Sequence, residues 1–225
     1  MNFRLSILVA VFCCSSLFSQ TIQSPKEFLG YELGKQFTRH HKVVEYFNYV
    51  STQLENVVLE KYGETNEHRP LYVSYISSKE NIKNLEQIRQ NNLGQTGLAA
   101  ASNNTIAIVW LSYNVHGNES SSTEASMQTL YELVTTKKEY LENTLVIIDP
   151  CINPDGRDRY ANWFNQVSGS SYNTDQNARE HREPWPGGRA NHYLFDLNRD
   201  WAWITQIESQ QRLKIYNKWK IGRAH

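Results

Sequence analysis

The sequence predicts one α/β domain in which helices flank a mixed, mostly parallel sheet. Helical and strand-like segments alternate along the chain, and two apolar runs are typical of buried strands. Each of these runs leads directly into a polar motif. Open α/β sheets bind their ligands at the carboxyl ends of their strands, so these motifs are candidates for a functional site.

The expected elements follow from the spacing of apolar residues. Helices are expected over residues 40–61, 79–90 and 123–135, and strands over residues 71–77, 105–113 and 144–148. A polar segment, residues 166–193, follows the last of these strands. A loop of that length in a compact domain is usually functional, so we expect it to border the substrate site.

A histidine and a carboxylate follow the strand expected over residues 105–113. His116 and Glu119 are three residues apart, and Gly117 between them permits a tight bend. Imidazole nitrogen and carboxylate oxygen are both good Zn²⁺ ligands, and a catalytic zinc has three protein ligands and an open position for water. We interpret the pair as half of a metal site, although an isolated pair with this spacing is also typical of an ordinary polar loop.

Further motifs follow in a fixed order. Asn153-Pro-Asp-Gly156 comes after the strand expected over residues 144–148, and Asp196-Leu-Asn198-Arg199 comes after the polar segment. An earlier turn, residues 63–69, has the pattern Gly-x-Thr-x-Glu-x-Arg. Together with the His116 motif, they resemble the zinc metallocarboxypeptidase family, the carboxypeptidase A-like enzymes, over roughly residues 63–201.

The resemblance implies a role for each matching residue. His116 and Glu119 match two zinc ligands, and Asp196 matches an aspartate that holds the other ring nitrogen of the histidine. Asn198 and Arg199 match the pair that binds the terminal carboxylate of the substrate, a task that suits a planar guanidinium. The expected cofactor is Zn²⁺, and the expected partner is a peptide or acyl-amino-acid substrate with a free carboxylate.

The family also uses an arginine, located before the Asn-Arg pair, to stabilise the oxyanion of the reaction. We expect Arg189 in this role, because it lies nine residues before Asn198, a spacing that resembles the cytosolic-type branch of the family. Arg159 and Arg182 remain open alternatives. Without a catalytic role, any one of these arginines would be a solvated loop cation or an ion-pair partner.

Two functional residues of the family have no match here. The resemblance calls for a third zinc ligand, a histidine, and for a general-base glutamate, both well beyond Trp201. We therefore expect residues 20–219 to be an incomplete catalytic domain, inactive by itself, that lacks the C-terminal part of the fold. Residues 220–225 resemble the translation of a sequencing adapter, so we expect a non-native tail.

The N-terminal segment predicts export. Residues 1–19 combine a positive start, an apolar core and a plausible cleavage region, which together indicate a signal peptide too short to span a membrane. The mature protein is then expected to be secreted or periplasmic, with no membrane association. Only Cys151 remains after cleavage, and its apolar surroundings predict a buried thiol.

The net charge and the motifs together limit the classes of function that the sequence allows. The 23 basic and 23 acidic residues cancel, which removes the usual electrostatic argument for a nucleic-acid partner. The preferred function is a zinc metallocarboxypeptidase that hydrolyses C-terminal residues from peptides. The alternatives are a zinc-dependent deacylase or cell-wall peptide amidohydrolase, and a non-catalytic carboxylate-binding domain of the same fold. A downstream histidine and glutamate would favour hydrolysis over binding alone.

Overall fold

The structure is a computed structural model that describes residues 21–100, 106–171 and 173–221. Its strands are β1 (Val57–Glu64), β2 (Pro70–Ile76), β3 (Ala107–Ser112) and β4 (Thr144–Asp149). Its α-helices are α2 (Pro25–Leu29), α3 (His40–Gln53), α4 (Lys79–Lys83), α5 (Leu85–Gln95), α6 (Ser121–Val134), α7 (Pro154–Val167) and α8 (Ile207–Trp219). Short 3-10 helices are η1 (Lys138–Leu141), η2 (Arg179–His181) and η3 (Leu197–Arg199).

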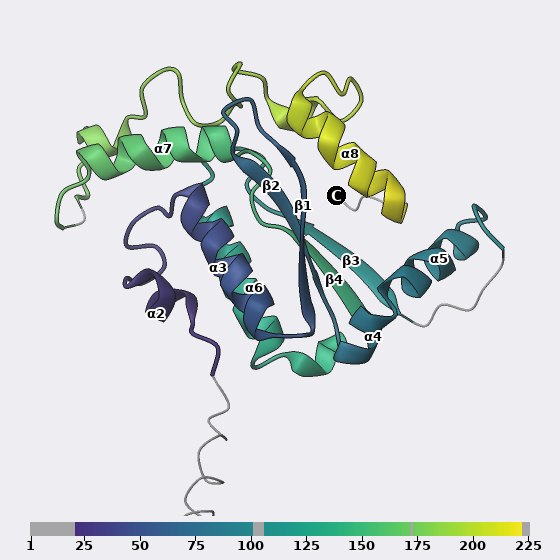
Figure 1. Ribbon diagram of the computed structural model, residues 1–225. Helices are drawn as coiled ribbons and strands as arrows, with labels where there is room; N and C mark the ends of the chain where they lie inside the picture. The colour runs from purple at the N-terminus through teal and green to yellow at the C-terminus, as the bar shows by residue number, and fades with distance from the viewer. Residues whose placement is uncertain (1–20, 101–105, 172, 222–225) are drawn as a thin grey trace, which may run out of the picture.

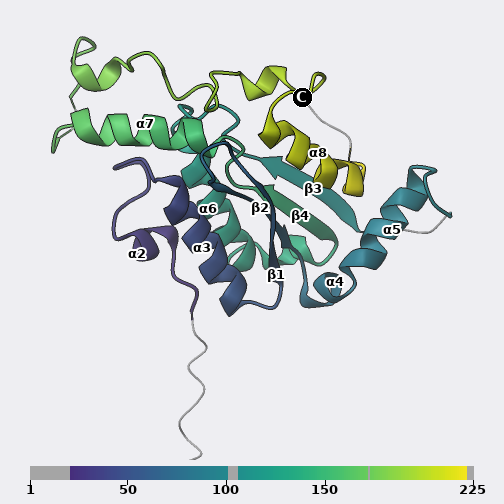
Figure 2. The ribbon, with the colours of Figure 1, turned by 45° about the horizontal axis from the view of Figure 1, so that its top comes forward.

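Helices cover both faces of the sheet, whose strand order is β1-β2-β4-β3 (Figures 1 and 2). Alternation along β4 builds both layers of the core. Val146 and Ile148 pack with α3 and α6 on one face. Leu145 and Ile147 pack with α5 and α8 on the other. Successive side chains of a strand point to opposite faces, so one apolar run serves two helix layers.

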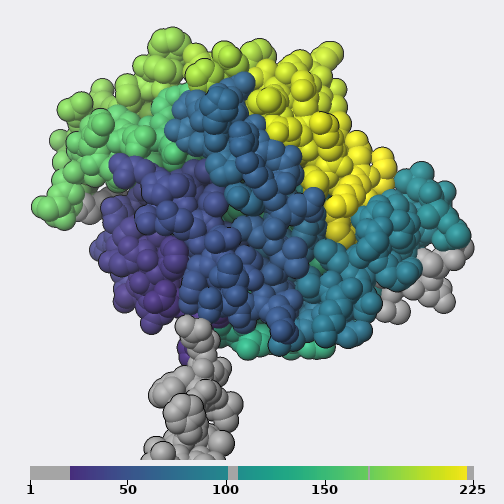
Figure 3. Space-filling model, in the orientation of Figure 1, coloured from purple at the N-terminus to yellow at the C-terminus, as the bar shows by residue number. Residues whose placement is uncertain are grey.

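The space-filling view places the N-terminal helices α2 and α3 and the C-terminal helix α8 at opposite sides of the β1–β2 hairpin (Figure 3). The predicted α/β sheet flanked by helices is therefore confirmed. The expectation of a mostly parallel sheet is wrong for the residues described, because β3 pairs with β4 in parallel but β1–β2 and β2–β4 are antiparallel. The short turn between β1 and β2 requires an antiparallel hairpin, since parallel neighbours need a long crossover.

The helix expected over residues 40–61 is too long by several residues. It ends at Gln53, and residues 57–61 belong to β1. Val57 and Val58 fit either a helical or a strand pattern, but β-branched side chains favour strands, and pairing with β2 satisfies their backbone groups. The helix expected over residues 79–90 is two helices, α4 and α5, which meet at Asn84.

The strand expected over residues 105–113 exists as β3, but it is not fully buried. Residue 105 lies outside the described residues, and Val109 is 41% exposed. Partial exposure follows from its position at the end of the strand order, where β3 pairs with β4 on one side. The other predicted elements correspond to β2, α6 and β4 within two residues at each end.

Among the described residues of the polar segment 166–193, η2 is the one regular element after α7 ends at Val167. The predicted buried thiol is confirmed, since Cys151 is free and 1% exposed. The expected signal peptide lies outside the described residues, as does most of the expected non-native tail. Within the described ranges, the helices are too short or too polar to cross a membrane.

Candidate functional site

The loop after β3 is organised by Asn114, which is buried and has a positive φ of 56°. Its side-chain amide donates to the backbone carbonyls of His116 and Glu119 at 3.1 and 3.2 Å. Asparagine tolerates this left-handed backbone better than most residues. The amide therefore closes the turn that carries the predicted metal half-site.

His116 lies between two carboxylates. Its Nδ1 atom is 2.7 Å from Glu119 Oε1, and its Nε2 atom is 2.9 Å from Asp196 Oδ1. A neutral imidazole carries one hydrogen, so it can donate to only one of the two. With that hydrogen on Nε2, the lone pair of Nδ1 faces the carboxylate of Glu119. A cation bound by both His116 Nδ1 and Glu119 Oε1 would make the approach of these two acceptors favourable.

The nitrogen and oxygen donors of His116 and Glu119 suit Zn²⁺. The ring is buried, whereas the side chain of Glu119 is about half exposed, so the pair faces the surface of the molecule. Asp196 lies on the opposite side of the imidazole ring from Glu119 and contacts its Nε2 atom. A carboxylate in that position fixes the tautomer and orientation of a metal-binding imidazole. The residues present therefore fit two zinc ligands and their support.

Asp196 is held in its charged form. Partial burial raises the pKa of its carboxyl, but hydrogen bonds from His116 and from the backbone N–H of Asn198 outweigh that effect and leave the pKa below its usual value. The Asn198 bond, at 2.9 Å, also caps η3. The same carboxylate thus orients the histidine and starts the turn that carries Asn198 and Arg199.

The structure separates the candidate arginines by their contacts. Arg189 donates to Asp196 Oδ2 at 3.0 Å, so it lies beside the His116 site, and its side chain is 51% exposed. Arg159 instead donates to backbone carbonyls, including that of Gly187 at 3.0 Å. Arg182 donates to Asn177 in the exposed loop. The geometry is compatible with the role predicted for Arg189, which stays a prediction.

Asn198 and Arg199 lie on η3, directly after Asp196. Arg199 is exposed, and Asn198 lines a cavity of about 440 Å³ together with Val115 and Trp201. Val115 immediately precedes His116, so the cavity adjoins the site. The predicted pair is therefore brought near the metal half-site, and its role in binding a carboxylate remains a prediction.

Three glycines bring the motifs into direct backbone contact. A β-carbon on Gly117 would lie 2.2 Å from the backbone nitrogen of Arg157, and one on Gly156 would lie 2.3 Å from the carbonyl oxygen of Gly188. Contacts this short exclude any side chain at these positions. The His116 turn, the start of α7 and the turn before Arg189 therefore form a single junction, which we call the glycine junction (Gly117, Gly156 and Gly188).

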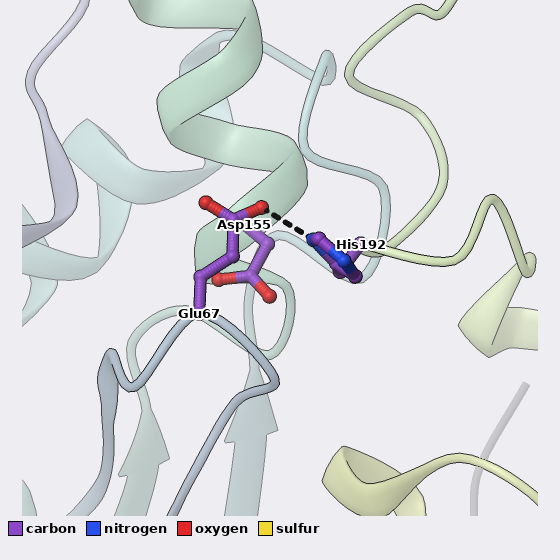
Figure 4. A group of neighbouring side chains, drawn as sticks. All are labelled: Glu67, Asp155 and His192. Carbon is purple, nitrogen blue, oxygen red and sulfur yellow. Dashed lines mark hydrogen bonds and ion pairs between the residues drawn. The ribbon is translucent and has the colours of Figure 1, made fainter.

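A second cluster was missed by the sequence analysis. One ligand atom from each of Glu67, Asp155 and His192 lies within 4.8 Å of the others (Figure 4). His192 Nδ1 is 3.0 Å from Glu67 Oε1, and the guanidinium of Arg69 donates to Glu67 Oε2 and to Asp155 Oδ1. Arg69 already supplies positive charge here, so the cluster joins the turn between β1 and β2 to α7 as an ion-pair network.

The parts of this cluster were visible in the sequence, but their meeting was not. Glu67 and Arg69 belong to the Gly-x-Thr-x-Glu-x-Arg turn, and Asp155 belongs to Asn153-Pro-Asp-Gly156. The presence of both motifs is the signal that could have suggested an ion pair between them. His192 offered no such signal, because it comes from the long polar segment.

Comparisons with known proteins bear on the family and the fold of the chain. The family model described as zinc carboxypeptidase matches residues 43–218. A search of curated proteins found none that matches the chain.

Among solved structures, the chain is similar in fold to carboxypeptidase A from Helicoverpa armigera, with a TM-score of 0.52, 14% identity and coverage of 96% of this chain and 49% of that one. It is also similar to thrombin-activatable fibrinolysis inhibitor, with a TM-score of 0.52, 12% identity and coverage of 95% and 50%. For a metallo-carboxypeptidase from Burkholderia cenocepacia, the TM-score is 0.50 at 15% identity, with coverage of 81% and 38%. The chain thus spans about half or less of these proteins.

The family model covers most of the chain, and it includes the His116 turn, the glycine junction and η3. The similarity to solved structures independently supports the fold. The chain belongs to the zinc carboxypeptidase family.

Proposed function

We propose that this chain carries part of the active site of a zinc-dependent metallocarboxypeptidase that removes C-terminal residues from peptides. The observation that carries the proposal is the position of the His116 ring between Glu119 and Asp196, with Arg189 on the second carboxylate. His116 Nδ1 and Glu119 Oε1 would hold the ion. Bound Zn²⁺ would supply Lewis acidity and lower the pKa of a water molecule.

The protein's own residues would prepare this chemistry in three ways. Asp196 accepts from His116 Nε2 and so keeps Nδ1 available for the ion. Arg189 brings a positive charge beside the site, where a tetrahedral intermediate would develop negative charge on its oxygen. Asn198 and Arg199 would bind the terminal carboxylate, which favours an exopeptidase over an endopeptidase.

Metal content tests the proposal. Whole protein purified with zinc should retain one bound Zn²⁺, and His116→Ala should lose it. His192→Ala is the matched control, because His192 is the histidine of the Glu67 cluster and should leave zinc content unchanged. Stoichiometric zinc in His116→Ala, or its loss only in His192→Ala, would place the metal elsewhere.

We also propose that residues 1–19 are removed during export and that the mature enzyme acts outside the cytoplasm. The support is the pattern of the sequence alone. N-terminal sequencing of the mature protein from its native source tests this: a start near Gln20 is expected, and a mature chain that retains Met1 would overturn it.

A further inference from the structure

Glu183 connects two motifs of the proposed active site. Its Oε2 atom accepts a hydrogen bond from the side-chain amide of Asn118 at 2.8 Å. Its Oε1 atom accepts from the backbone N–H of Gly188. Asn118 lies within the His116 turn, and Gly188 immediately precedes Arg189. One carboxylate therefore joins the turn that carries the metal half-site to the turn that carries the arginine.

The backbone around Arg189 is also held from the α7 side. Arg159 donates to the carbonyls of Gly187 and Asn191 at 3.0 and 3.1 Å. Asn153 donates to the carbonyl of Arg189 itself at 3.1 Å. These contacts fasten the turn to α7. Glu183 adds the contact that fastens the same turn to the His116 motif.

The side chain of Arg189 needs such support, because it is half exposed and, among the residues that the structure describes, forms an ion pair with Asp196 alone. A long, exposed side chain samples many rotamers, so the position of its guanidinium depends on how firmly its backbone is fixed. A displacement of about 1 Å in a catalytic constellation can lower a rate about a hundredfold.

We propose that Glu183 is a positioning residue, which sets the place of Arg189 relative to His116 and Glu119. Its catalytic consequence rests on the proposed function. The site suits a carboxylate: two donors approach its two oxygens, and each oxygen accepts one hydrogen bond. A glutamine has one acceptor oxygen and no charge. If it accepts from Gly188, it keeps Asn118 only when the Asn118 amide turns over, and both hydrogen bonds lose the charge that strengthens them.

The first arm of the test measures the turn itself by hydrogen–deuterium exchange. In Glu183→Gln, amides of residues 187–191 should exchange at least tenfold faster than in the wild type. Glu180→Gln is the matched control, since Glu180 accepts from the backbone of Gly169 and Asn173 inside the polar loop. It should leave exchange of residues 187–191 unchanged. Equal exchange in Glu183→Gln and the wild type would overturn the proposal.

The second arm measures peptide hydrolysis by the whole protein. Glu183→Gln should lower kcat about tenfold to a hundredfold and change KM by less than about threefold, because the effect acts through Arg189. In an Arg189→Ala background, the same substitution should have no further effect on kcat. An equal loss in both backgrounds would show that Glu183 does not act through Arg189.

The two arms separate this inference from the function it rests on. If the wild type hydrolyses no peptide, the proposed function fails, and the exchange measurement still decides whether Glu183 holds the turn. If Glu183→Gln does not fold, Glu183→Asp replaces it, since it keeps the charge but shortens the side chain by one methylene. Faster exchange over residues 187–191 is again expected, and unchanged exchange again contradicts the proposal.

Discussion

The backbone of Gly117 packs directly on that of Gly188: a β-carbon on Gly117 would lie 2.4 Å from the carbonyl oxygen of Gly188. The two residues are on turns that carry His116 on one side and Arg189 on the other. Their contact sets how closely the metal half-site and the arginine approach. A side chain on Gly117 would force the two turns apart, whereas one on Gly188 would meet Gly156 and Tyr160 of α7.

Gly117→Ala should therefore lower the free energy of unfolding by about 1–3 kcal/mol or more, because the added methyl group meets backbone atoms that can move only at a cost in free energy. Zinc affinity should fall as well. Gly169→Ala is the control, since its β-carbon would meet its nearest atom, the Ser171 carbonyl oxygen, at an ordinary 3.7 Å. Urea denaturation and metal titration measure both effects, and equal stability of the two variants would contradict the close packing.

A buried ion pair fastens α6 to α7. The guanidinium of Arg157 is fully buried and donates to both oxygens of Glu124, at 2.6 and 2.9 Å. Removal of one partner leaves an uncompensated buried charge, so Glu124→Ala should cost about 3–5 kcal/mol of unfolding free energy. Glu45→Ala breaks the exposed pair with Lys42 and should cost less than about 1 kcal/mol. Chemical denaturation measures the loss of unfolding free energy in each variant. A similar loss in Glu124→Ala and Glu45→Ala would contradict the prediction.

Stability should depend on the titration of Asp149. Burial raises the pKa of this carboxyl to about 7 in the folded protein, although Arg212 and the hydrogen bond from Tyr62 act in the opposite direction. Its ordinary value is 3.8, so between about pH 4 and pH 7 the unfolded chain loses the proton and the folded protein keeps it. Unfolding free energy should therefore fall as pH rises through this window and level off above it.

Asp149→Asn should remove this pH dependence of the unfolding free energy, because an amide does not titrate. Its oxygen can still accept the hydrogen bond from Tyr62. The size is on the order of 4 kcal/mol at most, since one pKa unit corresponds to about 1.4 kcal/mol. Denaturation curves of both proteins from pH 4 to pH 8 give the comparison. Parallel pH profiles would show that Asp149 ionises at its ordinary pKa.

Substrates with a blocked C-terminus test the roles of Asn198 and Arg199. Conversion of the terminal carboxylate to an amide should lower kcat/KM by about thirtyfold or more, because a charged partner is lost. Arg199→Ala should show the same loss on the free acid and little further loss on the amide. Arg39→Ala, at an exposed arginine that contacts Asn162, is the control and should hydrolyse both substrates like the wild type. Equal hydrolysis of acid and amide would exclude a carboxypeptidase.

The sequence predicted those parts of the protein that depend on local pattern. The run Thr144–Asp149 alternates between two helix layers, and its apolar character alone indicated a buried strand. His116 and Glu119 are three residues apart, so a single turn brings their side chains together. Asp196 was expected behind His116 only because the motifs resemble the zinc metallocarboxypeptidase family, since no local pattern reports a contact across 80 residues.

Only the tertiary structure decided features that depend on partners distant in the chain. Residues 57–61 suit a helix or a strand by apolar spacing, and pairing with β2 selects the strand. The glycine junction and the contacts of Glu183 arise where separate turns meet, and no period or motif reports such a meeting. The physical reason is that the spacing of residues along the chain determines on which face of a helix or strand a side chain lies. The residues that it contacts there are determined by long-range packing.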